Sequence, residues 1–237
     1  MDLNVRGIVF DKDGTLFEFG ATWESWAEGF LIRATKGDRA RAIAAGKAVG
    51  FDLAARRFLP SSIVIAGTVE EIADAFAPHF PEFEQIDILK MLNAEAEQAP
   101  QVEAVPLDPF LSNLTQRGIK LGVATNDGIN PAMAHLKTAG IIAHFKFIAG
   151  YDSGHGGKPE PGQLLVFCKH TKLSPQECIM VGDSLHDLRA GQAARMRTIG
   201  VLTGVADAAV LEPYADVVLP DIGHIPDWLD ANMPGQA

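Results

Sequence analysis

Residues 5–16 read VRGIVFDKDGTL, an apolar run that passes directly into two aspartates, a glycine and a threonine. The run predicts a buried strand. Asp11 and Asp13 then stand at its carboxyl end, on either side of Lys12, and Gly14 permits a tight turn. Ligands of open α/β sheets bind at this end of the strands, so one carboxylate can attack or ligate a metal while the other transfers a proton. A solvated Asp-Gly turn is the simpler interpretation of the same residues.

From residue 119 onward, short apolar runs alternate with helical periods. The strand-like runs are 119–124, 145–150, 177–181, 198–202 and 215–219, and the helical ones are 131–140, 161–173, 185–194 and 225–232. This alternation is typical of a parallel sheet covered by helices. We therefore expect an α/β fold with a Rossmann-like parallel sheet and helices on both faces.

Residues 21–104 interrupt this pattern, because they carry Ala, Glu, Phe and Leu at helical spacings and contain no strand series. Thr68 and Glu71 predict a capping box that opens the helix VEEIADAFA, and Pro78 is expected to end that helix. The segment therefore indicates a helical insertion after the first strand.

The insertion divides the chain into two expected domains. An all-helical cap domain is expected at residues 18–105, and a catalytic core is expected from residues 1–17 and 106–237. Hinges are expected near Glu18–Ala21 and Gln101–Pro106, where glycine and proline break the helical pattern.

The composition limits the class of protein. The 237 residues are 47% hydrophobic and 21% charged, as in ordinary globular proteins. No apolar stretch is long enough to cross a bilayer and the N-terminus is a poor secretory signal, so we expect a cytoplasmic protein with no membrane partner. The net charge of −10 at pH 7 disfavours a nucleic-acid partner. Cys168 and Cys178 fit a reducing compartment and a packing role.

Two further acids follow another predicted strand. The strand ECIMV ends at Gly182, and Asp183 and Asp187 lie in VGDSLHD directly after it. Ser184 is expected to cap the following helix, which places Asp187 one turn beyond Asp183. Hard oxygen ligands of this kind suit magnesium. An acidic helix start that complements the helix dipole would show the same residues.

Two other segments offer groups for phosphate binding. Thr125 and Asn126 end the run IKLGVA, where a hydroxyl and backbone N–H groups could hold a phosphate, although a turn would use the same residues. Lys158 precedes Pro159 in GGKPEP, and the proline fixes the local backbone so that the ammonium can act as a positioned point charge. A solvated loop lysine is the common alternative.

The order of these four segments is more specific than any one of them. DxDGT after a strand, TN after a strand, KP in a loop and GDxxxD after a strand together resemble the haloacid dehalogenase superfamily, and the resemblance covers nearly the whole chain. The position of the insertion is similar to the subclass with a helical cap after the first motif. Residues 150–161, 181–191 and 201–204 resemble phosphoglycolate-phosphatase-like members.

The resemblance implies a phosphatase that hydrolyses a small, phosphoglycolate-like phosphate monoester. By this resemblance Asp11 is the nucleophile that forms an aspartyl-phosphate, and Asp13 is the general acid and base. Thr125, Asn126 and Lys158 are implied to bind the phosphoryl group. The expected partner is thus a small-molecule substrate.

The same resemblance implies magnesium as the cofactor. Its expected ligands are Asp11, the backbone carbonyl of Asp13, and Asp183, with Asp187 supporting the site. Several acids in one pocket repel one another, and magnesium together with Lys158 would offset that repulsion.

Two other functions remain open for these motifs. A phosphosugar mutase would share all four of them, and a non-catalytic phosphometabolite-binding protein could use the same fold. Dehalogenase and phosphonatase chemistry are disfavoured, because those branches replace the second aspartate of the first motif and Asp13 is present here.

Some residues depart from the family pattern, and others allow two interpretations. Lys12 stands where the family usually has an apolar residue, and Arg195 stands where a glycine often ends the helix. Trp23 and Trp26 are expected to pack in the cap interior, with pocket lining as the alternative. The first half of the insertion is basic, which suggests an anionic leaving group, although its second half is acidic.

Overall fold

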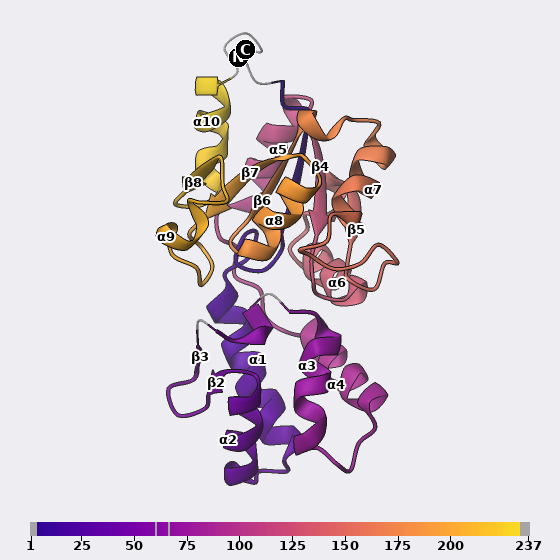
Figure 1. The fold of residues 1–237 in the computed structure, drawn as a ribbon, viewed down its shortest axis with the longest axis vertical. Coiled ribbons are helices and arrows are strands. Elements are labelled where there is room, and N and C mark those ends of the chain that lie inside the picture. The colour runs from indigo at the N-terminus through magenta and orange to yellow at the C-terminus, as the bar shows by residue number, and fades with distance from the viewer. Residues whose placement is uncertain (1–3, 60, 66, 233–237) are drawn as a thin grey trace.

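A six-stranded parallel sheet forms one end of the molecule and a group of helices forms the other (Figure 1). The computed structural model describes residues 4–59, 61–65 and 67–232. The strand order is β5-β4-β1-β6-β7-β8. The strands are β1 (Gly7–Phe10), β4 (Lys120–Ala124), β5 (Phe145–Ala149), β6 (Cys178–Gly182), β7 (Arg197–Val201) and β8 (Val217–Leu219). Each overlaps a predicted run, so the Rossmann-like α/β prediction is confirmed.

Helices cover both faces of this sheet because its central strands are apolar on both sides. Ile8 and Phe10 of β1 join one buried cluster, whereas Val9 joins another on the opposite face. The first cluster draws on α5 (Leu107–Gln116), α6 (Ile129–Thr138) and α10 (Ile225–Asn232). The second draws on α7 (Gly162–Thr171) and α8 (Leu185–Ala193). A short helix, α9 (Ala208–Leu211), precedes β8.

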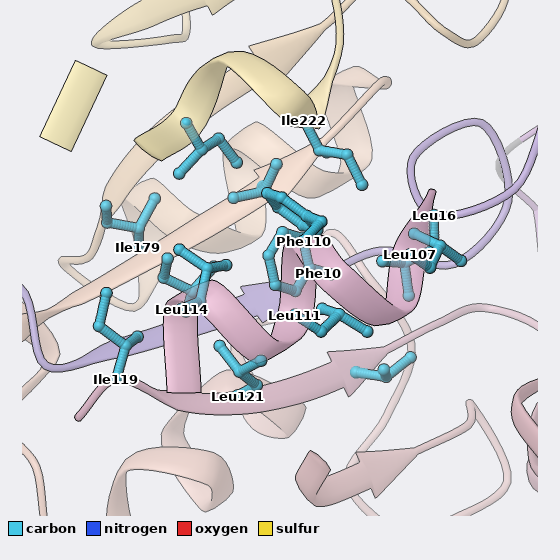
Figure 2. Close-up of a cluster of buried hydrophobic side chains, with 14 of the residues drawn as sticks. Phe10, Leu16, Leu107, Phe110, Leu111, Leu114, Ile119, Leu121, Ile179 and Ile222 are labelled. Carbon is cyan, nitrogen blue, oxygen red and sulfur yellow. The ribbon is translucent and has the colours of Figure 1, made fainter. Parts of the chain in front are cut away.

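The first cluster closes around the strand that carries the DxDGT motif. Phe10 meets Phe110 edge to face at a ring-centroid distance of 5.9 Å. Leu16, Leu107 and Leu111 lie beside them, as Figure 2 shows. The residues on both sides of Asp11–Thr15 are therefore fixed by a dry core, which holds the motif loop in place.

The insertion has a separate apolar core. Its helices are α1 (Phe19–Ala34), α2 (Arg39–Ala48), α3 (Val69–Phe76) and α4 (Gln85–Glu97), with 3₁₀ turns at η1 (Ile63–Ile65) and η2 (Ala77–His79). Their buried residues form one cluster from Phe19 to Ala99. The capping box is confirmed: the Thr68 side chain accepts a hydrogen bond from the Glu71 N–H, and the Glu71 carboxylate accepts one from the Thr68 N–H.

The insertion also contains a small antiparallel hairpin, β2 (Phe51–Asp52) and β3 (Arg57–Phe58), which the sequence analysis did not anticipate. Strands of two residues are too short to show a period of two. None of the described helices is both long and apolar enough to cross a membrane.

Candidate active site

The motif residues meet at the carboxyl edge of three adjacent strands. In the sheet β1 lies between β4 and β6, with Phe10 in register with Val123 and Val181. Asp11 therefore follows β1 at the same level at which Thr125 follows β4 and Asp183 follows β6. The parallel topology alone brings together groups that lie more than 100 residues apart in sequence.

Lys158 connects the acids that follow β1 and β6. Its buried ammonium donates to Asp11 Oδ1 at 2.6 Å and to Asp187 Oδ1 at 2.5 Å. Asn126 holds the lysine backbone on both sides, because its Nδ2 donates to the Lys158 carbonyl at 2.8 Å and its Oδ1 accepts from the Lys158 N–H at 2.7 Å. The Lys158–Pro159 peptide bond is cis. The ammonium is thus a fixed positive charge beside Asp11.

Burial and like charges dominate the electrostatics of the site. Burial, with repulsion from Asp187 and Asp13, raises the pKa of Asp11 to about 7 despite the attraction of Lys158. Burial, followed by Asp187 and Asp11, raises the pKa of Asp183 well above its usual range. Burial opposes charge on Lys158, but the neighbouring Asp11 and Asp187 carboxylates outweigh it and raise the pKa of this lysine. When all of these carboxylates are ionised, their negative charge therefore exceeds the single positive charge that Lys158 supplies.

Three of these acids are arranged as a cation site. Ligand oxygens of Asp11, Asp183 and Asp187 all lie within 4.8 Å of one another. The Asp13 carboxylate is not part of this group. An all-oxygen, buried, anionic site fits a hard divalent cation such as magnesium, and it supplies the repulsion that such a cation would relieve.

Close backbone packing shapes this acidic group. A Cβ on Gly14, whose φ is +79°, would lie 2.5 Å from Asp183 Oδ2, and a Cβ on Gly204 would overlap the same carboxylate. Thr203 Oγ1 donates to the Gly14 carbonyl at 2.6 Å, which ties the loop after β7 to the motif loop. The glycine of VLTG, Gly204, is therefore a structural part of the site, because only a residue without a side chain fits beside Asp183.

Lys12 forms a second charged cluster that the sequence did not reveal. Its ammonium is fully buried, lies 2.7 Å from the Asp13 carboxylate and 3.3 Å from Asp127, and donates to His135 Nδ1 at 3.0 Å. His135 Nε2 donates in turn to the carbonyl of Ala96 in cap helix α4 at 2.6 Å. Burial and the nearby Lys12 charge lower the pKa of His135 to about 4, so the ring is neutral and can accept from the lysine.

The pocket lies between the sheet and the insertion and has a volume of about 60 Å³. Its core wall is polar and contains Asp11, Asp13, Thr125, Asn126, Asp127, Lys158, Ser184, His186 and Asp187. Its cap wall is apolar and contains Phe19, Trp23, Trp26, Val64, Ile65, Gly67, Val69, Ile72, Leu92 and Ala96. Trp23 and Trp26 thus both line the pocket and pack in the cap core, where their rings meet at 5.1 Å.

The structure brings together all the site residues that the sequence predicts, and only Asp183 lies outside the pocket wall. All of them except Asp183 line the pocket; Asp183 lies 2% exposed beside it, in the acidic group. Ser184 caps α8 as expected, and its N–H and hydroxyl both donate to Asp187 Oδ2. This capping box and the ion pair with Lys158 fix the Asp187 carboxylate. The acidic helix start is therefore not merely solvated.

The family model described as haloacid dehalogenase-like hydrolase matches residues 5–195. The phosphoglycolate phosphatase of Pectobacterium atrosepticum is 27% identical over 234 residues, 93% of each chain. The pyrophosphatase PpaX of Bacillus pumilus is 30% identical over 155 residues, 64% of this chain and 72% of the relative. Other relatives match over a shorter stretch, and this chain spans about half of their length.

Among solved structures, CbbY from Rhodobacter sphaeroides in complex with phosphate matches with a TM-score of 0.69 at 19% identity. The match covers 93% of this chain and 96% of that chain, and it shows that the two share a fold.

Proposed function

Because the chain belongs to the haloacid dehalogenase-like hydrolase family, we propose that it is a magnesium-dependent phosphatase that hydrolyses a small phosphate monoester through an aspartyl-phosphate on Asp11. Its relatives include proteins named phosphoglycolate phosphatase and pyrophosphatase. The observation that carries the proposal is the position of Asp11, which lies at the end of β1, in a pocket, with the Lys158 ammonium 2.6 Å away.

In the proposed reaction Asp11 attacks phosphorus in line with the ester oxygen. The bond from phosphorus to the ester oxygen breaks, and Asp13 gives its proton to the departing alkoxide. Asp13 then takes a proton from water as the water oxygen attacks phosphorus, which releases inorganic phosphate and regenerates the Asp11 carboxylate. Both steps depend mainly on aligning the attacking oxygen with phosphorus and on neutralising the charge of the phosphoryl oxygens.

The residues around the phosphoryl group would supply that positioning. Lys158 contributes its fixed charge, while the Thr125 hydroxyl and Asn126 line the same wall of the pocket. The Thr125 hydroxyl also accepts a hydrogen bond from the Asp127 N–H at 3.0 Å, which leaves its own proton available to donate to a phosphoryl oxygen.

Magnesium would be held by Asp11, the Asp13 backbone carbonyl and Asp183, with Asp187 in support. When bound, the ion neutralises charge on the phosphoryl oxygens and on the acids. Both thiols are free and buried, so we also place the protein in a reducing compartment such as the cytoplasm.

The test is to assay the purified protein with magnesium against a panel of small phosphate monoesters, beginning with phosphoglycolate. Release of inorganic phosphate is expected, and borohydride added during turnover should convert Asp11 to homoserine, detected by mass spectrometry. Isomerisation of a sugar phosphate without net phosphate release would instead indicate a mutase. Binding without turnover of any ester would indicate a phosphometabolite-binding protein.

A further inference from the structure

The cap wall of the pocket carries no charge among the described residues. It consists of aromatic and aliphatic side chains from α1, η1, α3 and α4, with Gly67 between them. The two cap positions outside the described residues, Pro60 and Ala66, are uncharged by their chemistry. The leaving group of a bound ester would therefore face an apolar surface.

The basic residues of the insertion lie elsewhere, which contradicts the expectation of an anionic leaving group drawn from its sequence. Arg33 pairs with Glu95, Arg41 with Glu82 at 2.5 Å, and Arg56 with Glu28 at 2.5 Å. The remaining basic side chains of the insertion are exposed and none lines the pocket; they are Lys36, Arg39, Lys47, Arg57 and Lys90. The basic residues of the insertion thus lie on its solvent-exposed surface and not in the pocket.

Neither lysine beside the core wall is free to pair with a second anionic group. Lys158 is used by Asp11 and Asp187, and Lys12 is fully buried and shared by Asp13, Asp127 and His135. A second anionic group on the substrate would meet carboxylates and uncharged polar groups on one side and apolar carbon on the other, with no lysine or arginine to pair with it. Burying such a group without a partner is strongly unfavourable.

We propose that the preferred substrate is the monophosphate of a small uncharged alcohol, whose carbon skeleton contacts Trp23, Trp26 and Val64. This inference rests on the proposed phosphatase function and narrows it. It separates this chain from relatives whose names specify phosphoglycolate or pyrophosphate, since both compounds carry a second anionic group next to the transferred phosphoryl group.

The test compares two esters of nearly equal shape. Isobutyl phosphate carries an isopropyl group where phosphoglycolate has its carboxylate, so two methyl groups take the places of the two carboxylate oxygens. With wild-type protein and magnesium at pH 8, kcat/KM for isobutyl phosphate should exceed that for phosphoglycolate by about 100-fold or more. Faster hydrolysis of phosphoglycolate would overturn the inference alone. No phosphate release from any ester would overturn the proposed function and the inference with it.

A charge placed in the cap wall should reverse the preference. Val64→Lys is expected to raise kcat/KM for phosphoglycolate and lower it for isobutyl phosphate, because the half-buried position gives the new ammonium access to the pocket. Ile43→Lys adds the same charge to α2, at the far end of the cap from the sheet (Figure 1), and should leave the ratio unchanged. A ratio that moves equally in both variants would contradict the assigned contact. The wild-type comparison stands even where Val64→Lys fails to fold.

Discussion

The ionised form of Asp11, which the proposed reaction needs as nucleophile, lowers the stability of the metal-free fold. Its pKa is raised from 3.8 to about 7, mainly by burial, so the folded state holds its proton more tightly than the unfolded chain does. The stabilisation that this proton provides is complete below about pH 4 and is lost as the pH rises through about 7. Without metal, the ionised carboxylate therefore destabilises the protein at pH 8.

Asp11→Asn should abolish turnover while raising the melting temperature of the metal-free protein at pH 8. Asparagine is nearly isosteric, is a very poor nucleophile and carries no charge, so kcat is expected to fall on the order of 10,000-fold. The gain in melting temperature over wild type should shrink at pH 5, where the wild-type residue is protonated. Thermal scans in chelator and a phosphate-release assay check both effects. Near-normal turnover would remove Asp11 as the nucleophile.

Lys12 is expected to position Asp13 for proton transfer. Its ammonium holds the Asp13 carboxylate at 2.7 Å and is anchored by His135 at 3.0 Å. Lys12→Met keeps most of the length of the side chain and removes the ammonium that holds Asp13. General acid catalysis is worth about 100-fold or more when the leaving group is a poor one. We expect kcat to fall about 100-fold for ethyl phosphate but less than about tenfold for trifluoroethyl phosphate, whose alkoxide leaves without much help.

Lys120→Met provides the control for Lys12→Met. Lys120 is a part-buried lysine whose ammonium donates to the Thr171 carbonyl, away from the pocket. Its loss should affect both esters equally. Equal losses for the two esters in Lys12→Met would indicate a purely structural role.

The four motifs identified the residues around Asp11 because each contains several chemical groups at fixed spacing. The role of Lys12 could not be found in that way. Its partners Asp127 and His135 lie more than 100 residues further along the chain, and only the pairing of β1 with β4 brings them near. Burial of a lysine depends on such distant partners, so a local sequence pattern does not encode it.

At the scale of single elements, the end of α8 keeps a left-handed residue without using glycine. Arg195 has a φ of +61° and is exposed, and the Met196 N–H closes the turn on the Gly191 carbonyl at 2.9 Å. Arg195 therefore adopts the left-handed conformation that a glycine usually provides at this helix end. The side chain is expected to cost about 1 kcal/mol relative to glycine at such a φ.

Arg195→Gly should therefore raise the free energy of unfolding by about 0.5–1 kcal/mol. Lys169→Gly is the matched control, because it places glycine at an exposed position inside α7 and should lower stability by about 1 kcal/mol. Urea denaturation of both variants and wild type checks the pair. Equal losses of unfolding free energy in the two variants would show that glycine is not favoured over arginine at position 195.

The sheet was predictable because each of its strands is a short apolar run between helical periods, and β4, β6 and β7 lie within one residue of the predicted runs. The arrangement of the cap was less predictable. The sequence predicted α3 and helical spacing through the rest of the insertion, but which helix faces meet the core depends on contacts such as that between His135 and the Ala96 carbonyl. For the same reason, the basic residues of the cap suggested a charged pocket where the structure has an apolar one.

At the scale of the molecule, magnesium should stabilise the fold in a pH-dependent way. Its ligands must be deprotonated, yet the pKa of Asp11 is raised to about 7 and that of Asp183 is raised well above normal. At pH 8 the ion replaces few protons, whereas at pH 5.5 it must displace several. The rise in melting temperature on adding magnesium should therefore be larger at pH 8 than at pH 5.5.

The stabilisation at pH 8 should approach about 2.7 kcal/mol when magnesium is present at 100 times its Kd. Calcium should also raise the melting temperature but should not support turnover, because it accepts longer bonds and more ligands than the reaction geometry allows. Asp183→Asn is expected to lose most of the shift. A shift that is the same at both pH values would contradict the assigned ligands.

The cap and the sheet have separate apolar cores, and this favours movement of the cap as a unit. One cluster lies within the insertion and the other two lie on the faces of the sheet. The described contact between the two parts is concentrated where α4 lies against α6, with His135 bonded to the Ala96 carbonyl and Asn93 next to Gly128. Interfaces of limited extent between domains permit such movement.

Tryptophan fluorescence should report this movement, since the chain has three tryptophans and two of them, Trp23 and Trp26, line the pocket. The third, Trp228, lies on α10 and packs against the core of the sheet, so Trp228→Phe leaves only the cap signal. The pocket lies between the cap and the sheet, so closure of the cap over a bound phosphoryl group is expected to change the surroundings of both indoles. In Trp228→Phe, stopped-flow mixing of the magnesium-loaded protein with inorganic phosphate should change the fluorescence at a rate that reaches a plateau as phosphate increases, because closure then limits the step. A rate that rises linearly without limit, or calorimetric binding with no change in fluorescence, would mean that phosphate enters a rigid pocket.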